Sequence, residues 1–181
     1  MGRVIIHQRS CVDPITWIGE AAGICWGADI TDPVKNYKRG VDCIQNQHGR
    51  TWEFPDVFFV LDDYSARVIR EFYTHIGGAP TRLQESTRYI DYSDFEYVTP
   101  HSIESNPIAK GIWDRMMENT AGILKFLEEE HSIPREDTGM GLPLGMETKI
   151  IVKMNMRTLI DMSHQRLCTR AYWEYLSLIH I

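Results

Sequence analysis

Two proline-led helices are predicted near the start of the chain. Asp13-Pro14 and Asp32-Pro33 each place an aspartate at the N-cap and a proline at the first helical position, which are start signals of a helix. Apolar residues at helical spacing follow the first pair at Trp17, Ile18, Ala21, Ala22 and Cys25. The second pair leads to a similar pattern that ends before Gln47-His48-Gly49. A second helix is therefore expected directly after the first.

The middle of the chain mixes strand and helix patterns. Residues Trp52 to Leu61 are dense in aromatic and β-branched side chains and predict a strand, whose early part Pro55 restricts to an edge or a bulge. Ser65 is expected to cap a short helix, and Pro107 opens a long one. The apolar positions of the long helix lie near one stripe, at Ile108, Ile112, Met116, Ile123, Leu124 and Leu127.

The C-terminal part predicts one more strand and one more helix. Lys149 to Lys153 has the pattern of a short buried strand, and residues from Asn155 to the end predict a helix. No repeat or linker divides the chain, and there is no regular βαβ alternation. We therefore expect a single α+β domain spanning residues 1–181.

Two segments interrupt these patterns. The stretch from Gly77 to Asp94 follows neither a helical nor a strand period, and Pro134 to Gly145 is irregular as well. Long irregular segments are uncommon in compact domains unless they serve a function. The first stretch is therefore a candidate ligand site.

Length and charge narrow the class of protein. The chain has 181 residues, which is near the size of one ordinary domain, and 43% of them are hydrophobic. A formal charge of -6 supplies no general attraction for nucleic acid or an anionic membrane. The apolar runs are far shorter than the ~20 residues of a membrane span, and no secretory signal is recognisable. We expect a cytoplasmic protein without nucleic-acid or membrane partners, with Cys11, Cys25, Cys43 and Cys168 as reduced thiols.

Common catalytic signatures do not occur. There is no GxxxxGK[ST] loop or GxSxG elbow, and Gly139 to Gly145 misses the GxGxxG spacing. The histidines are scattered without ligand spacing, so we expect no metal site.

Two polar features remain, each with two interpretations. Asn155, Thr158, Met162 and Arg166 would share one face of the last helix. They could recognise an elongated ligand, or the arginines of this helix could form ordinary surface pairs. Ser86 and Thr87 beside Arg88 suit a phosphate monoester, and a capped turn would show the same residues.

The segment from Asn155 to Glu174 resembles the signature helix of flavin-dependent thymidylate synthases, the ThyX family. Other stretches resemble family segments in the same order along the chain: Ala21 to Cys25, His48 to Phe54, Gln84 to Tyr89, and Leu142-Pro143. The likeness covers nearly the whole chain. It implies a twisted, mainly antiparallel sheet flanked by helices, and a homotetramer with sites built between subunits.

The resemblance also implies a reaction, the reductive methylation of dUMP to dTMP. Methylenetetrahydrofolate and NADPH are the implied co-substrates, and FAD is the implied cofactor. Residues implied to contact FAD are Glu53, His75, Asn155, Arg157 and Asp161. Residues implied to hold dUMP are Gln84, Ser86, Thr87, Arg88 and Arg166. Arg166 is the implied catalytic residue, because a permanent cation stabilises the uracil anion as its N3 proton leaves.

Several departures from the family pattern favour a second reading. Thr74-His75-Ile76 stands where the family has Arg-His-Arg, and nine residues, Gly77 to Glu85, replace the usual seven. Gly139 stands where family members place an arginine before Leu-Pro. Arg82 could replace one lost cation, with Arg67 and Arg70 as weaker candidates. The alternative function is therefore a non-catalytic or altered-specificity relative that binds nucleotides.

The last residues, Tyr175 to Ile181, do not extend the resemblance, although family members usually continue well beyond this point. We therefore expect a truncated C-terminus.

Overall fold

The computed structural model describes residues 2–77 and 79–180. Three residues of the predicted domain lie outside the described residues: Met1, Gly78 and Ile181. Of these, Gly78 belongs to the predicted irregular segment from Gly77 to Asp94. The chain divides into two compact units. Unit 1 comprises Met1–Arg3, Leu61–Phe72 and Gln84–Ile150, and unit 2 comprises Val4–Val60, Tyr73–Leu83 and Ile151–Ile181.

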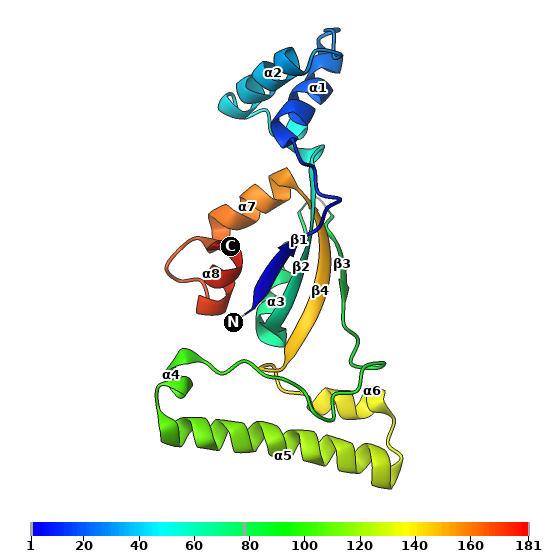
Figure 1. Ribbon diagram of the computed structural model, residues 1–181, viewed down its shortest axis with the longest axis vertical. Helices are drawn as coiled ribbons and strands as arrows, with labels where there is room; N and C mark the ends of the chain where they lie inside the picture. Colours follow the sequence, from blue (N-terminus) through cyan, green and yellow to red (C-terminus); the bar gives the residue numbers. More distant parts are fainter. Residues whose placement is uncertain (1, 78, 181) are drawn as a thin grey trace. The chain divides into compact units, whose positions relative to one another are not determined.

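The strands form a four-stranded antiparallel sheet. Its strands are β1 (Arg3–Ile6), β2 (Asp56–Ser65), β3 (Thr81–Gln84) and β4 (Glu147–Asn155), in the order β1-β2-β4-β3 (Figure 1). Along β4, buried and more exposed residues alternate, with Thr148, Ile150, Val152 and Met154 buried. This period of two is typical of a strand that buries one face. The α+β prediction is confirmed. Among residues 2–77 and 79–180, no helix is long and apolar enough to span a membrane.

In unit 2, helices α1 (Pro14–Cys25) and α2 (Pro33–Gln45) form an antiparallel hairpin (Figure 1). The Asp13 carboxylate accepts a hydrogen bond from the Thr16 amide, and the Asp32 carboxylate accepts from the amides of Val34 and Lys35. Each contact satisfies amides that the first turn leaves without partners. Both predicted helix starts are thus confirmed.

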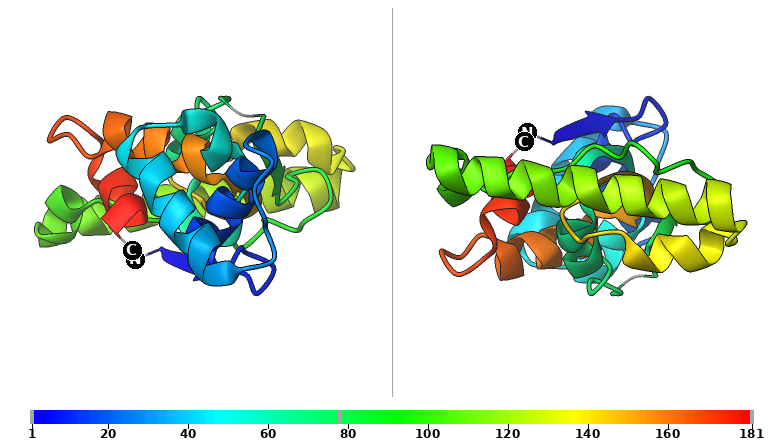
Figure 2. Two further views of the ribbon diagram at one scale, coloured as in Figure 1. Left: turned by 90° about the horizontal axis from the view of Figure 1, so that it is seen from above. Right: turned by 90° about the horizontal axis from the view of Figure 1, so that it is seen from below.

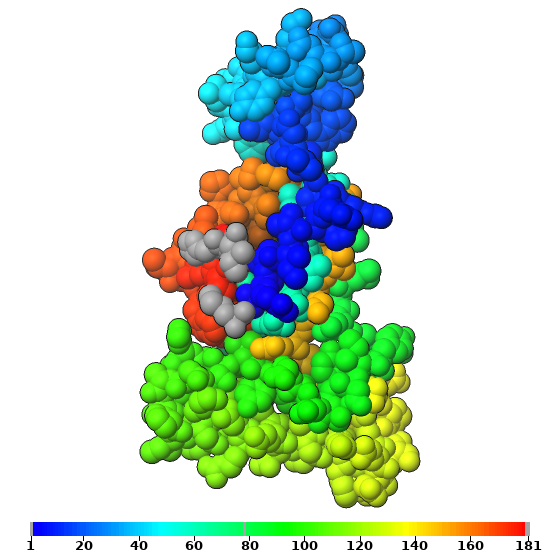
Figure 3. All heavy atoms as spheres, viewed as in Figure 1, coloured from blue at the N-terminus to red at the C-terminus, as the bar shows by residue number. Residues whose placement is uncertain are grey.

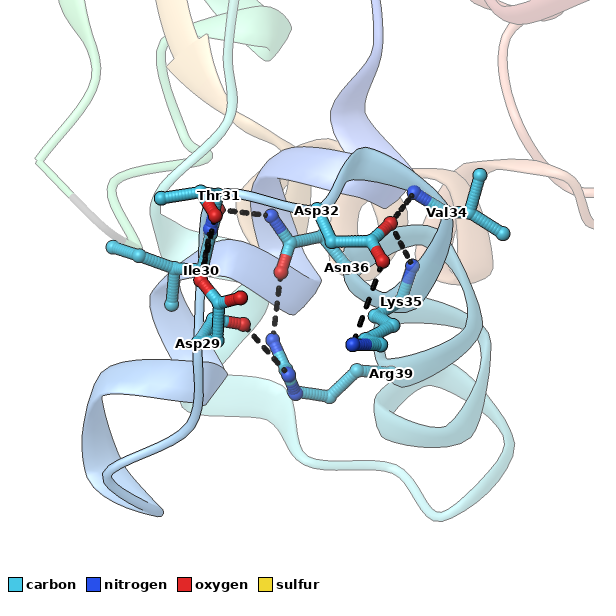
Figure 4. A network of polar contacts seen from close by, with 8 residues as sticks. All are labelled: Asp29, Ile30, Thr31, Asp32, Val34, Lys35, Asn36 and Arg39. Atoms are coloured by element: carbon cyan, nitrogen blue, oxygen red, sulfur yellow. Dashed lines mark hydrogen bonds and ion pairs between the residues drawn. The ribbon is translucent and has the colours of Figure 1, made fainter.

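The two helices cross closely because glycines lie at the crossing. A Cβ added to Gly19 would lie 1.8 Å from the carbonyl oxygen of Asn36, and one added to Gly40 would lie 1.9 Å from that of Ile15. Around this crossing, the Arg39 guanidinium donates to the Gly19 carbonyl at 2.9 Å. It also donates to the buried Asn36 side chain at 2.8 Å (Figure 4). The same network includes the Asn36 amide group, which donates to the Ile30 carbonyl.

The predicted strand from Trp52 to Leu61 is wrong at its beginning. Residues Gly49–Glu53 form a 3₁₀ helix, η1, and β2 starts only at Asp56. Pro55 precedes that start and cannot donate to a strand ladder. The aromatic Trp52 instead packs against the buried cluster of Ile18, Ala22 and Cys43.

Two further boundaries differ from the prediction. The segment from Gly77 to Asp94 contains β3, which pairs with β4 although its own sequence shows no strand period. The single predicted C-terminal helix is two helices, α7 (Met156–Arg166) and α8 (Trp173–His180). The first ends where the Leu167 amide donates to the Ser163 carbonyl, and Cys168 and Thr169, both weak helix formers, follow.

Unit 1 contains the remaining helices: α3 (Ala66–Phe72), α4 (His101–Glu104), α5 (Pro107–His131), α6 (Arg135–Thr138) and the 3₁₀ helix η2 (Gly139–Gly141). The Ser65 hydroxyl accepts from the Val68 amide at 3.2 Å, which confirms the predicted cap. Phe95, Met117 and Met146 form a buried cluster. Helix α5 begins at Pro107 as predicted, and its atoms are among the green and yellow-green ones in the space-filling view (Figure 3).

A buried carboxylate joins the start of the chain to the sheet in unit 1. The Asp62 side chain, 8% exposed, pairs with Arg3 at 2.7 Å and with Lys149 at 2.9 Å. Two cations offset the cost of removing this charge from water. The next residue, Asp63, has φ 59°, an uncommon conformation for a residue inside a strand.

Candidate functional site

Arg166, at the end of α7, contacts the segment that replaces the Arg-His-Arg motif. Its Nε donates to His75 Nε2 at 2.9 Å, and its Nη2 donates to Thr74 Oγ1 at 3.2 Å. The guanidinium carbon also lies 4.7 Å from the centre of the Tyr175 ring, within range of a cation–π interaction. Within unit 2, the end of α7 therefore lies against residues 74 and 75.

His75 is buried, with 8% of its surface exposed. Burial lowers its pKa below the ordinary 6.5, and the positive charges of Arg166 and Arg82 lower the pKa further. Because Nε2 accepts the Arg166 hydrogen bond, that nitrogen carries no proton. Arg82 itself lies over the Tyr73 ring, 4.5 Å from its centre.

The first turn of α7 is bound to the same bend. Asn155 is the N-cap of the helix, and its side-chain oxygen accepts from the Thr158 amide at 2.8 Å. The Thr158 hydroxyl donates to the carbonyl oxygen of Gly77 at 2.8 Å. Both ends of α7 therefore hold residues 74–77, and the Asn155 oxygen already has a structural partner.

Glu53 and Arg157 meet where η1 contacts α7. The Arg157 Nη1 lies 2.7 Å from Glu53 Oε1, and Arg50 reaches the other carboxylate oxygen at 3.7 Å. A Cβ added to Gly49 would lie 3.4 Å from the Arg157 guanidinium carbon, so the backbone of η1 borders this group closely. Asp161, also predicted to contact FAD, is exposed on α7.

The arginines of this region suit an anionic cofactor. The side chains of Arg50 and Arg157 are 86% and 45% exposed although both pair with Glu53. A guanidinium presents five donors, so one carboxylate leaves capacity for a phosphate. The residues present therefore fit a dinucleotide that carries phosphates.

The predicted nucleotide segment lies in unit 1. Ser86 Oγ accepts from the Arg88 amide at 3.2 Å, which is the capped turn that the sequence alone left open. The Arg88 side chain pairs with Glu136 of α6 at 3.1 Å, and both side chains are more than half exposed. Gln84 Nε2 donates to Thr148 Oγ1 at 3.3 Å.

Thr87 packs against Gly139, the position at which the resemblance leads one to expect an arginine. A Cβ on Gly139 would lie 3.2 Å from the Thr87 carbonyl oxygen and 3.3 Å from its Cβ. Both residues line a small cavity whose polar walls include Glu128, Arg135 and Thr138. The structure thus gives a packing reason for glycine at position 139.

Sequence reasoning missed three participants in these contacts. Thr74 holds Arg166, Glu136 holds Arg88, and Arg135 pairs with Glu128 at 3.2 Å beside the Thr87 cavity. For Thr74, the one signal in the sequence was that it precedes His75. Nothing in the sequence pattern distinguished Glu136 or Arg135 from other surface residues. Within the described ranges 2–77 and 79–180, no cluster of three His, Cys, Asp or Glu residues could hold a metal ion.

Comparison with known proteins identifies the family. The sequence profile described as thymidylate synthase complementing protein, Thy1, matches residues 10–180. The flavin-dependent thymidylate synthase of Geobacter sulfurreducens is 35% identical over 175 residues, covering 92% of this chain and 74% of that protein. This chain belongs to the Thy1 family. The family member from Nitratidesulfovibrio vulgaris, also described as a flavin-dependent thymidylate synthase, is 28% identical over 159 residues.

Solved structures of the family share the fold. Thymidylate synthase X of Helicobacter pylori, crystallised with FAD and dUMP, matches with a TM-score of 0.73 over 99% of this chain and 90% of that one, at 18% identity. The chain matches only part of the length of some Thy1 relatives. The match spans 64% of the Nitratidesulfovibrio vulgaris protein and 44% of the one from Clostridium tetani.

Proposed function

We propose that this chain is a flavin-dependent thymidylate synthase that converts dUMP to dTMP by reductive methylation. FAD is the proposed cofactor, with NADPH as the reductant and methylenetetrahydrofolate as the methylene donor. The family match and the relatives described as flavin-dependent thymidylate synthases support this proposal. In this proposal, residues 1–181 belong to one catalytic domain.

The observation that carries the proposal is the placement of Arg166. Its guanidinium is held by Thr74 and His75, on the segment that the resemblance places where the family has Arg-His-Arg. In the proposed reaction this cation faces the uracil ring and stabilises the negative charge left when N3 loses its proton. Arginine suits this role because it keeps its charge at any physiological pH.

FAD would be held by residues of unit 2. Arg157, with Glu53 fixing its orientation at 2.7 Å, would bind the cofactor phosphates. His75, Asn155 and Asp161 complete the proposed set, in which Asn155 also caps α7. When bound, FAD supplies the hydride that the pyrimidine accepts.

The nucleotide would be held by Gln84, Ser86, Thr87 and Arg88. Arg88 pairs with Glu136 in an exposed ion pair, which contributes about 0–1 kcal/mol and can exchange for a phosphate at little cost. The Thr87 hydroxyl adds a short donor.

Self-association as a homotetramer is part of the proposal, and helix α5 supports it. In the view from below, α5 is one long, uninterrupted helix (Figure 2). Its apolar stripe is exposed, with Ile108 at 78%, Ile112 at 58%, Met116 at 46% and Ile123 at 59%. A continuous exposed apolar stripe on a long helix is typical of a surface that another chain covers. Sedimentation of the purified protein tests self-association, and a monomer at micromolar concentration would contradict the homotetramer.

A cytoplasmic location stays a prediction.

The function is tested by the flavin spectrum. The purified chain should bind added FAD, and dUMP should then shift the flavin absorbance, whereas Arg166→Ala should bind FAD and lose most of the dUMP-induced shift. Arg170→Ala, an exposed arginine four residues further on, is the matched control and should behave as wild type. Protein that ignores FAD would contradict the proposal and favour the non-catalytic relative, which the missing arginines at positions 74 and 76 would explain.

A further inference from the structure

The contact between Arg166 and residues 74–75 imposes a chemical requirement on its partners. A guanidinium only donates hydrogen bonds, so each atom to which it is hydrogen-bonded must accept. Two such acceptors are His75 Nε2, 2.9 Å from Nε, and Thr74 Oγ1, 3.2 Å from Nη2. An arginine or lysine at position 74 would bring a second donor and a second positive charge to the same place. Threonine satisfies the contact without adding charge.

The imidazole can accept only in one form. Neutral histidine with its proton on Nδ1 has a lone pair on Nε2, whereas the imidazolium has none. Protonation would break the hydrogen bond and set two cations side by side. The alternative neutral tautomer would direct an N–H at the Arg166 N–H.

The surroundings of His75 favour the neutral form. The charges that act on it are those of Arg166, on α7, and Arg82, on β3, and both are positive. From α8 the Tyr175 ring packs against it, with ring centres 6.0 Å apart, and the histidine is 8% exposed. Burial and both arginines therefore act in the same direction.

We propose that Thr74 and His75 are positioning residues, which orient the Arg166 guanidinium through two acceptors, with His75 held as the neutral Nδ1–H tautomer. The part of this inference that concerns nucleotide binding rests on the proposed function of Arg166. The pair acts on the nucleotide through Arg166, so removing the Thr74 acceptor, which is not one of the proposed FAD-binding residues, should weaken dUMP binding and leave FAD binding unchanged.

The tautomer can be tested on the full chain without any ligand. Histidine labelled with ¹⁵N distinguishes a protonated from an unprotonated ring nitrogen, and the signal that disappears in His75→Gln identifies His75. At pH 7 we expect protonated Nδ1 and unprotonated Nε2. In Arg166→Gln the pKa of His75 should rise, because a neighbouring positive charge is lost. A protonated Nε2 or a charged imidazolium at pH 7 would overturn the proposal.

Orientation of Arg166 is tested by the exchange of its Nε–H with water. This proton should exchange slowly in wild type and in His75→Gln, whose amide oxygen can accept in place of Nε2. It should exchange rapidly in His75→Leu, which fills similar space without an acceptor. Equal exchange in the two variants would contradict the role of the acceptor, whatever the protein binds.

The effect on nucleotide binding is tested with two conservative substitutions of Thr74. Thr74→Val removes the acceptor and keeps the shape, and Thr74→Ser keeps the acceptor. With FAD bound, Thr74→Val should weaken dUMP binding about fivefold, as expected for the loss of one hydrogen bond, and Thr74→Ser should stay within about twofold of wild type. Equal affinities would overturn the proposal. If the wild-type protein does not bind dUMP, the proposed function is contradicted. The exchange of the Arg166 Nε–H then decides by itself whether Thr74 and His75 orient Arg166.

Discussion

Replacing Gly19 by alanine tests how closely α1 and α2 must approach. The new Cβ would lie 1.8 Å from the Asn36 carbonyl oxygen and 2.6 Å from the Gly40 nitrogen, and both are backbone atoms of α2. Backbone atoms inside a helix cannot rotate out of the way, so the helices must separate by more than about 1 Å. That separation would also stretch the 2.9 Å hydrogen bond from Arg39 to the Gly19 carbonyl.

The expected cost follows from these two effects. Overpacking of a tight contact costs about 1–3 kcal/mol, and disruption of a hydrogen bond in a part-buried site adds about 1 kcal/mol. We therefore expect Gly19→Ala to lower the free energy of unfolding by about 3 kcal/mol. In a chain of this size that corresponds to a melting temperature roughly 6–12 °C lower.

A matched control comes from another helical glycine. A Cβ added to Gly111, in α5, meets nothing within 4 Å. Gly111→Ala should therefore raise stability by about 0.5–1 kcal/mol, because alanine is the better helix former. Urea denaturation followed by circular dichroism measures both variants. Gly19→Ala within about 0.5 kcal/mol of wild type would refute the close crossing of the helices.

Three further outcomes are expected. Thr158→Val removes the donor to the Gly77 carbonyl, so it should lower the free energy of unfolding in urea by about 1–2 kcal/mol. It should also speed amide exchange in residues 74–77, and unchanged exchange would contradict this contact. Asn106→Ala should cost about 1 kcal/mol, since its side chain caps α5 through two amides, and a stability equal to wild type would show that the cap is unimportant. Because the folded pKa of His75 lies below 6.5, its contribution to stability is present above pH 6.5 and is lost as the pH falls toward the folded value. The urea midpoint should therefore decline on acidification more steeply in wild type than in His75→Gln, and parallel profiles would contradict the assignment.

Local capping chemistry explains why some elements were predictable. The Asp-Pro pairs at 13–14 and 32–33, the cap at Ser65 and the proline at 107 each act within one helical turn, and all four helices begin where these signals predict. Such signals depend on neighbours in sequence, so the fold does not override them.

Elements that depend on distant partners were predicted less well. Aromatic density around Trp52 indicated a strand, but that density reflects packing on the α1–α2 cluster, and the backbone forms a 3₁₀ helix. The four residues of β3 are a strand only because β4 pairs with them. Helical period alone did not reveal the break after Arg166, where the chain turns before α8 begins.

The candidate site was also predictable only in part. The resemblance in sequence brought Arg166 and His75 into one hypothesis, and the structure places them in direct contact. The role of Thr74 could not be predicted, because a hydroxyl has no fixed partner until the fold brings a guanidinium to it. The roles assigned to Gln84, Ser86, Thr87 and Arg88 stay predictions.

The most direct test of the proposed reaction is the release of tritium from dUMP labelled at C5, with FAD, NADPH and methylenetetrahydrofolate present. Methylation replaces the hydrogen at C5, so wild type should release tritium into water in step with dTMP formation, and Arg166→Ala should release almost none. Wild-type protein that binds FAD and dUMP but releases no tritium would contradict the account.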